Sequence, residues 1–288
     1  MKLVESIRES CFALGAPPDD LLSPQGALSE LLAASGVYSG ERADIGTFSM
    51  DRVSWPEVGA RPTPLLGALP PADCEWFRTW DSHMLREPRQ AAAKQSELGL
   101  KRVHNDPDLF RTPGAYFRFL HHLEQSGMLR WERARGRKGA LGVFFVKKKD
   151  SRLRIIFDTR MLNTHFVDPP KTALPSAAAM ASIEAPAGSD FYWGSADLSN
   201  AFYCMGVPTN LSSMFSLTPI RASHTDVTAL EGTPVTPEEW LLPCLTILPM
   251  GWAWSLHLCQ RVVSGVVERF IPQGCMVEDK RAGVRTAS

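Results

Sequence analysis

The spacing of hydrophobic residues predicts helices in the first hundred residues. Over 1–36, apolar residues recur at helical intervals in two short runs, each closed by a glycine. Five prolines interrupt the pattern over 37–72, so we expect a linker there. Another helix is expected from about Trp76 to Leu85, inside a helical connector over 73–100. We assign no chemistry to these segments.

A well-defined amphipathic helix is expected after residue 111. Thr112 and Pro113 suit an N-cap and a first helical residue, and Gly127 is a natural end. Between them, four apolar residues follow helical spacing, namely Tyr116, Phe119, Leu120 and Leu123.

A β-hairpin is predicted next. The runs 141–149 and 152–158 alternate like strands and flank the polar pair Asp150-Ser151. On the second strand, one face carries Leu153, Ile155 and Phe157, and the other carries Arg152, Arg154, Asp158 and Arg160. Lysines near the tip and arginines on one face suit a mobile phosphate clamp. Taken alone, the pattern favours a hairpin that simply turns its charges to solvent.

Two later stretches carry further candidate chemistry. Residues 191–197 are typical of a buried strand that ends in Asp197 and turns into a helix. A carboxylate in that position is costly unless it is paired or binds a cation, although a lone one is more often a helix cap. Residues 248–254 are typical of a loop that enters a helix continuing to Phe270.

The net charge of zero hides a local asymmetry. The chain has 31 basic and 31 acidic side chains, which at first argues against a nucleic-acid protein. Residues 101–160, however, carry 15 basic and 6 acidic side chains, while both flanking segments are net negative. A basic block of this kind attracts anions, or forms a solvated face.

Composition excludes several classes of protein. The six cysteines form no C-x-x-C pair, so neither a usual zinc site nor a disulfide framework is expected. No apolar run approaches the roughly 20 residues that span a bilayer, and the charged N-terminus does not suit a signal peptide. We therefore expect an intracellular chain, nuclear or cytoplasmic, that is not secreted and has no transmembrane segment or membrane partner.

Three stretches in order resemble the fingers and palm of a reverse transcriptase of the retroviral and retrotransposon type. The first, 147–163, resembles the fingers hairpin and the run that follows it, which ends in leucine-asparagine. The second, 196–202, resembles the first catalytic palm motif. The third, 248–260, resembles the loop and helix that support template and nucleotide. The resemblance covers roughly 100–270.

This resemblance implies roles for individual residues. Lys148 and Arg154 match the fingers residues that grip the incoming triphosphate. Asp197 matches the first catalytic aspartate and a Mg²⁺ ligand, and the carbonyl of Leu198 matches a further ligand. Phe202 matches the aromatic gate beneath the sugar. Three residues of the third stretch match its nucleotide-facing and close-packed positions: Met250, Gly251 and Ser255. Asp158 and Arg160 match residues that fix the strand. The implied partners are an RNA or DNA template-primer and a deoxynucleoside triphosphate.

The sequence also departs from the family pattern. Met250 cannot hydrogen-bond as an amide would, so its contact with nucleotide is in doubt. The second catalytic motif, aromatic-x-Asp-Asp, has no counterpart after Gln260, and Glu278-Asp279 lacks both the aromatic residue and a hairpin pattern. One carboxylate holds too little charge for two Mg²⁺ ions. We therefore expect a truncated reverse transcriptase from a mobile element that is inactive alone.

The expected fold class is α+β, with right-hand polymerase fingers and a partial palm over 101–275. A helical N-terminal extension precedes it, an incomplete palm sheet leaves room for a protein partner, and a disordered tail follows over 276–288. Two alternatives remain open. One is a domesticated, non-catalytic nucleic-acid-binding protein, and the other is a scaffold whose acidic N-terminal helices recruit a partner.

Overall fold

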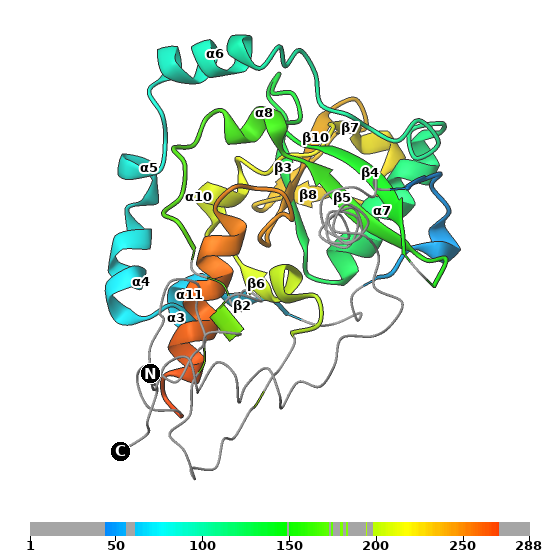
Figure 1. Cartoon of the computed structure of the whole chain (residues 1–288). Coiled ribbons are helices and arrows are strands. Elements are labelled where there is room, and N and C mark those ends of the chain that lie inside the picture. The colour runs from blue at the N-terminus through cyan, green and yellow to red at the C-terminus, as the bar shows by residue number, and fades with distance from the viewer. Residues whose placement is uncertain are drawn as a thin grey trace, which may run out of the picture. The chain divides into compact units, whose positions relative to one another are not determined.

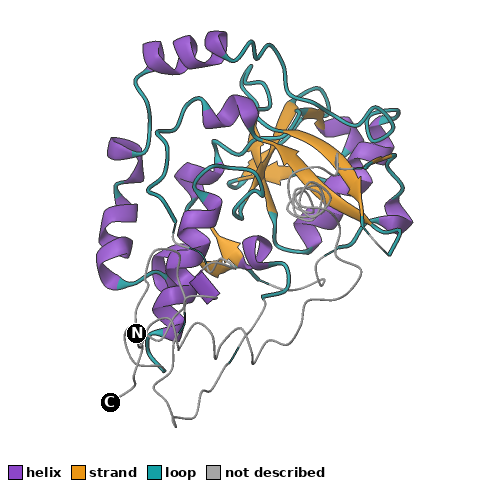
Figure 2. Ribbon diagram, in the orientation of Figure 1, coloured by secondary structure: helices purple, strands orange, loops and turns teal. Residues whose placement is uncertain are grey.

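The computed structural model describes residues 44–55, 61–148, 150–172, 174, 179–180, 183, 194 and 198–270. The chain divides into two compact units at Asp44–Ile45, and the fold below is that of the second unit. It is a mixed α+β fold in which small sheets are packed with helices (Figure 1, Figure 2). The strand predicted over 191–197 and the tail over 276–288 lie outside the described residues.

The described part of 45–72 belongs to the folded unit that begins at Ile45. It contains β1 (Ile45–Gly46), η1 (Met50–Arg52), β2 (Thr63–Pro64) and α3 (Leu65–Ala68). Its side chains Val53, Leu65 and Leu69 are buried in the main core. Three of the four described prolines that suggested a linker, Pro64, Pro70 and Pro71, stand at helix starts, where a missing N–H costs nothing. The described part of 37–72 is therefore packed structure.

Helices α4 (Pro71–Arg78), α5 (Trp80–His83) and α6 (Pro88–Glu97) follow. The prediction of one continuous helix from Trp76 to Leu85 is wrong, because the chain breaks at Thr79. The Thr79 hydroxyl donates to the carbonyl of Trp76, and the Ser82 hydroxyl donates to the carbonyl of Thr79. Such local side-chain bonds compete with helical hydrogen bonds.

The predicted amphipathic helix is confirmed as α7 (Pro113–Gln125). The hydroxyl of Thr112 accepts a hydrogen bond from the amide of Ala115 at 3.1 Å, which caps the helix. Gly127 follows the helix with a φ of 68°, a conformation that favours glycine. The predicted apolar stripe is buried: Tyr116, Phe119, Leu120 and Leu123.

The predicted hairpin is also confirmed. Strands β4 (Gly142–Lys147) and β5 (Leu153–Asp158) pair antiparallel, and β1 adds to β4, so the sheet order is β1-β4-β5. A second antiparallel sheet has the order β3-β10-β7, from β3 (Leu129–Arg133), β10 (Trp240–Leu245) and β7 (Ile220–Arg221).

The smaller elements complete the described fold. Strand β6 (Met205–Gly206) pairs parallel with β2, and β8 (Ala229–Leu230) pairs with β9 (Thr233–Pro234). Single-turn helices are α8 (Arg160–Asn163), η2 (Ala201–Cys204), α10 (Thr209–Ser212) and η3 (Ala222–His224).

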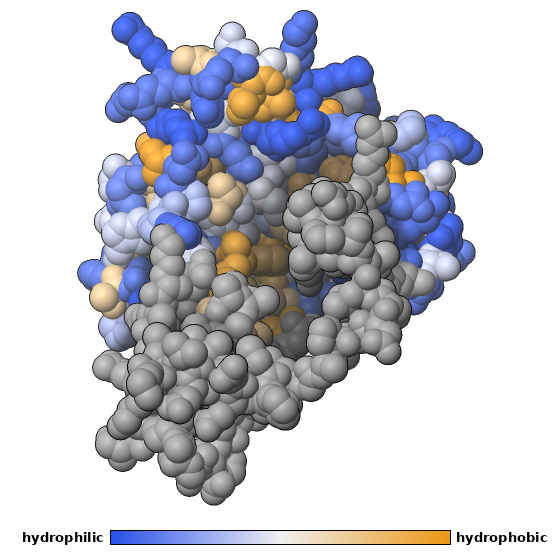
Figure 3. All heavy atoms as spheres, viewed as in Figure 1, coloured by the Kyte–Doolittle hydropathy of each residue, from blue (hydrophilic) through white to orange (hydrophobic). Residues whose placement is uncertain are grey.

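The long C-terminal helix α11 (Ser255–Val267) contacts α3 (Figure 1). It was predicted to continue to Phe270, but it ends at Val267, and Phe270 is 81% exposed. Hydrophilic residues cover much of the described surface on the face in Figure 3, consistent with a shared apolar core beneath. Among the described residues, none of the helices is long and apolar enough to cross a membrane.

Candidate functional site

The outer edge of β5 contacts residues from segments that are far apart in the sequence. Carbonyls of alternate strand residues point to the same side, and β5 is the last strand of its sheet. The carbonyl of Leu153 accepts from the Ser54 amide at 2.8 Å, and that of Ile155 accepts from the Tyr203 hydroxyl at 3.2 Å. The carbonyl of Phe157 lies 3.3 Å from the ideal Cβ position of Gly251.

These three contacts place distant stretches of sequence side by side. Ser54 comes from the N-terminal segment, Tyr203 from η2, which follows the second stretch that resembles reverse transcriptases, and Gly251 from the third. The edge of β5, itself part of the first stretch, therefore carries a residue of the third stretch and the residue directly after the second.

Lys148 and Arg154 share one face of the hairpin. Arg154 pairs with Val146 in the register of β4 and β5, and the amide of Lys148 donates to the carbonyl of Arg152 at 2.7 Å. The two cationic residues are therefore diagonal neighbours on the face opposite the buried Leu153, Ile155 and Phe157.

Arg154 also lies beside η2. Burial raises the pKa of Tyr203 to about 12, and the positive charge of Arg154 opposes this rise. Tyr203 is buried, whereas Arg154 is exposed and the neighbouring Phe202 is half-buried. The predicted triphosphate arginine and the predicted sugar gate are thus brought to adjoining parts of the fold.

The 249–254 loop is held closely against the end of β5. Gly251 has a φ of 105°, and an ideal Cβ there would lie 3.0 Å from the Thr159 hydroxyl oxygen. The side-chain amide of Asn163 donates to the carbonyl of Gly251, and its oxygen accepts from the amide of Ala253, both at 3.0 Å. Glycine is therefore required here by backbone conformation and by close packing.

Two other residues of the third stretch have defined places. The hydroxyl of Ser255 is buried and donates to the carbonyl of Pro249 at 2.7 Å, which closes the loop onto the start of α11. Met250 is half-buried. The loop geometry supports close packing at Gly251 and Ser255, and a contact between Met250 and nucleotide stays a prediction.

Asp158 and Arg160 form a structural pair. The buried Asp158 carboxylate accepts from the amide of His104 at 2.6 Å and from Nε of Arg160 at 2.8 Å. Burial alone would raise the pKa of Asp158, but hydrogen bonds from Arg160 and His104 outweigh it, so the pKa is lowered. The pair ties the end of β5 to the chain before α7.

The expected metal ligands are only partly within the described residues. Asp197 lies outside them, and Leu198 is described, with a side chain that is 55% exposed. Within the part of the chain that the structure describes, no group of three or more His, Cys, Asp or Glu side chains could hold a metal ion. Magnesium binding at Asp197 and at the carbonyl of Leu198 therefore stays a prediction.

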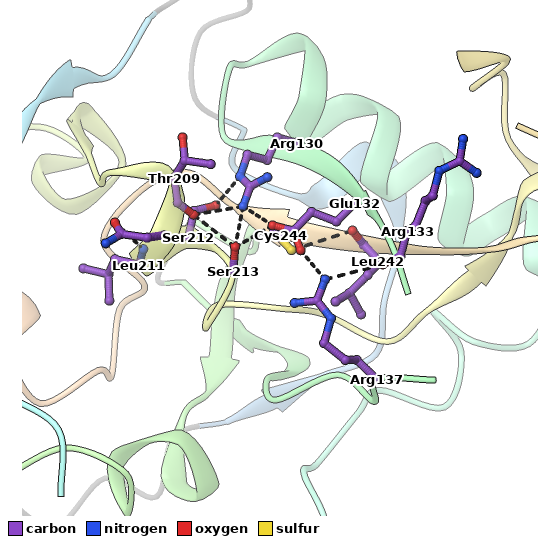
Figure 4. Close-up of polar contacts among 11 residues, drawn as sticks. Arg130, Glu132, Arg133, Arg137, Thr209, Leu211, Ser212, Ser213, Leu242 and Cys244 are labelled. Carbon is purple, nitrogen blue, oxygen red and sulfur yellow. Dashed lines mark hydrogen bonds and ion pairs between the residues drawn. The ribbon is translucent and has the colours of Figure 1, made fainter. Parts of the chain in front are cut away.

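A second polar cluster, around Glu132 on β3, was not anticipated (Figure 4). Glu132 accepts from the hydroxyl of Ser213 at 2.5 Å and is paired with Arg130 and Arg137. Burial opposes ionisation, but these three hydrogen-bond donors prevail and lower the pKa of Glu132 to about 2. Arg133 is similarly paired with Glu239 on the neighbouring loop.

These ion pairs separate the arginines that are held within the fold from Arg154, which faces solvent. Four arginines of the basic block over 101–160 are held within the fold, because Arg130, Arg133, Arg137 and Arg160 all contact carboxylates. Arg154 forms no ion pair with another described residue and is exposed. It is thus better placed than these paired arginines to meet an external anion.

Sequence reasoning missed several residues that build the site. Asn163 stands at the end of the 147–163 run, so its position was a usable signal. Tyr203 directly follows Phe202, but nothing in the neighbouring sequence predicts the hydrogen bond from its hydroxyl to the carbonyl of Ile155 on β5. Arg52 and Ser54 carry no sequence signal, because their contacts with the hairpin span roughly a hundred residues of sequence.

Neither a protein-family model nor a curated protein matches the chain. The site is therefore interpreted from its own geometry.

Proposed function

We propose that this chain is a reverse-transcriptase-like protein whose hairpin β4–β5 binds the phosphates of a nucleoside triphosphate. The observation that carries the proposal is the meeting along β5 of Gly251, from the third resembling stretch, and Tyr203, the residue directly after the second, while β5 itself belongs to the first. A chance set of motifs has no reason to converge in space, whereas a nucleotide site needs a phosphate clamp, a platform for the sugar and a closely packed supporting loop. The α+β fold is compatible with polymerase fingers and palm.

In this proposal the described residues have separate roles. Arg154 offers two hydrogen-bond donors in a fixed fork to phosphate oxygens, and Lys148 supplies a compact positive charge next to it. Phe202 presents an aromatic ring beneath the sugar. Gly251 lets its loop approach the end of β5 without a side chain between them. Electrostatic attraction to the nucleic-acid backbone would add to affinity and make it salt-dependent.

The expected chemistry is template-directed DNA synthesis in the family, and we propose that this chain does not polymerise by itself. The sequence holds one candidate metal-binding carboxylate, Asp197, where two Mg²⁺ ions need more negative charge and more oxygen ligands. Magnesium, when bound, would supply charge stabilisation for phosphoryl transfer. A protein partner that completes the site is part of the proposal.

Triphosphate binding is the direct test of the proposed function. A fluorescent deoxynucleoside triphosphate should bind the wild-type chain, and the double variant Lys148→Ala/Arg154→Ala should bind it about 100-fold more weakly, as expected for two charged contacts. The matched control, Lys101→Ala/Arg102→Ala, removes one lysine and one arginine from the same basic block at exposed positions. Equal losses of triphosphate affinity in both double variants would mean that only the overall positive charge matters, and would contradict the proposal.

Primer extension on RNA and DNA templates tests the inactivity claim. We expect no incorporation with Mg²⁺ or Mn²⁺, and incorporation that is abolished by Asp197→Ala would overturn that part of the proposal. Salt-dependent duplex binding with no triphosphate binding would instead favour a non-catalytic nucleic-acid-binding protein. A chain that binds neither the duplex nor the triphosphate would favour the scaffold alternative.

A further inference from the structure

The segment 45–55, here called the strap, lies across both strands of the hairpin. Ile45 and Gly46 pair with Val146 and Phe145 on β4. At the other end of the strap, Val53 forms a parallel bridge with Leu153 on β5. Gly46 approaches so closely that an added Cβ would lie 2.5 Å from a methyl carbon of Leu153. The hairpin is therefore held from both edges.

The strap also forms hydrogen bonds with the tip of the hairpin. Nε and Nη2 of Arg52 donate to the carbonyl of Ser151 at 3.0 and 2.6 Å. Ser151 has a φ of 64°, a left-handed conformation that is unfavourable for a residue with a side chain. Two charged donors on one carbonyl stabilise the tip in this conformation.

One contact of the strap reaches the predicted triphosphate residue directly. The ammonium group of Lys148 donates to the hydroxyl of Ser54 at 3.3 Å, while the Asp150 carboxylate lies 3.9 Å from it. The amide of the same Ser54 is bonded to the carbonyl of Leu153. Because lysine is a flexible chain with considerable rotamer freedom, a fixed hydroxyl partner limits where its charge lies.

Two aromatic residues of the strap pack against α7. The ring of Phe48 lies 6.3 Å from Phe119 on α7 and 5.0 Å from Phe145 on β4. The ring of Trp55 lies 5.6 Å from Phe119 and 4.2 Å from His122. The strap thus connects the amphipathic helix α7 with the hairpin tip, and α7 supports it.

We infer that the strap positions the Lys148 ammonium group for the terminal phosphates of a triphosphate, with Ser54 and Arg52 as positioning residues. This inference rests on the proposed function. Ser54 fixes the position of the Lys148 ammonium group, and Arg52 stabilises the conformation of the turn that follows Lys148. Neither residue needs to touch the nucleotide. Pre-organisation of this kind raises affinity because less side-chain and loop entropy is lost on binding.

The test compares Ser54→Ala and Arg52→Ala with Arg61→Ala, which removes an exposed arginine outside the strap. Fluorescent deoxynucleoside triphosphate and monophosphate are titrated into each full-length variant. We expect the two strap variants to bind triphosphate about threefold to tenfold more weakly, with a smaller change for monophosphate. Ser54→Thr, which keeps the hydroxyl, should restore binding. Hydrogen exchange should be faster at the hairpin tip in Arg52→Ala.

The outcomes separate this inference from the proposed function. Wild-type triphosphate affinity in both strap variants would overturn the positioning role and leave the proposed function standing. Equal weakening for triphosphate and monophosphate would mean a structural role only, and would also overturn it. A wild-type chain that binds no triphosphate would overturn both, whatever the exchange rates at the tip.

Discussion

The side chain of Asn163 forms hydrogen bonds with two backbone groups of the loop around Gly251. Its amide nitrogen donates to the carbonyl of Gly251, and its oxygen accepts from the amide of Ala253, each at 3.0 Å. This one side chain, at the end of α8, therefore connects the run after the hairpin with the loop before α11. The arrangement of the candidate site depends on such long-range contacts.

Replacing Asn163 should loosen the 249–254 loop. We expect Asn163→Ala to lower the free energy of unfolding by about 2 kcal/mol, because two hydrogen bonds of about 1 kcal/mol each are lost. Asn163→Asp keeps the acceptor for the Ala253 amide but loses the donor to the Gly251 carbonyl. Its free energy of unfolding should therefore also be lower than that of the wild type. Urea denaturation measures both, and wild-type stability in Asn163→Ala would contradict this role of Asn163.

Gly251 should not tolerate a side chain. Its φ of 105° and the neighbouring Thr159 hydroxyl predict that Gly251→Ala destabilises the fold by about 1–3 kcal/mol. Gly67 in α3 is the matched control, since an added Cβ there meets nothing within 4 Å. Gly67→Ala should leave the midpoint of thermal unfolding unchanged or slightly higher. Equal midpoints for the two variants would mean that the loop adapts.

The Glu132 cluster should make stability depend on pH in the acid range. The folded-state pKa of about 2 lies below the ordinary value of 4.5, so the carboxylate contributes stability above about pH 4.5. This contribution is lost as the pH falls toward 2. Urea denaturation between pH 7 and 3 should show a shallower decline for Glu132→Gln, together with lower stability at pH 7. Glu97→Gln, which alters an exposed carboxylate on α6, should follow the wild-type curve.

The bond between Tyr203 and β5 should be detectable without disturbing the core. Tyr203→Phe keeps the ring but removes the hydroxyl that donates to the carbonyl of Ile155. A buried carbonyl without its partner costs about 1–3 kcal/mol, and chemical denaturation should show a loss in this range. Hydrogen exchange should also be faster across η2. If neither changes, the contact does not hold η2 against the strand.

The sequence alone was sufficient where structure depends on neighbours a few residues apart. The cap at Thr112, the apolar stripe of α7 and the alternation of β4 and β5 are local patterns, and each element forms as predicted. Local patterns were insufficient at Thr79, where side-chain hydrogen bonds break a helix. They were also insufficient over 45–55 and 61–72, where prolines begin helices and apolar side chains enter the core.

Tertiary structure alone decided which charges face outward and which stretches meet. Counting charges identified a basic block, but only the fold shows that Arg130 and Arg137 share the carboxylate of Glu132 while Arg154 is exposed. Likewise, Ser54 and Tyr203 are far apart in sequence and come together on β5 because alternate carbonyls of an outer strand need partners. Gly251 packs against the end of the same strand. Such pairings depend on distances in space, which periodicity along a chain does not encode.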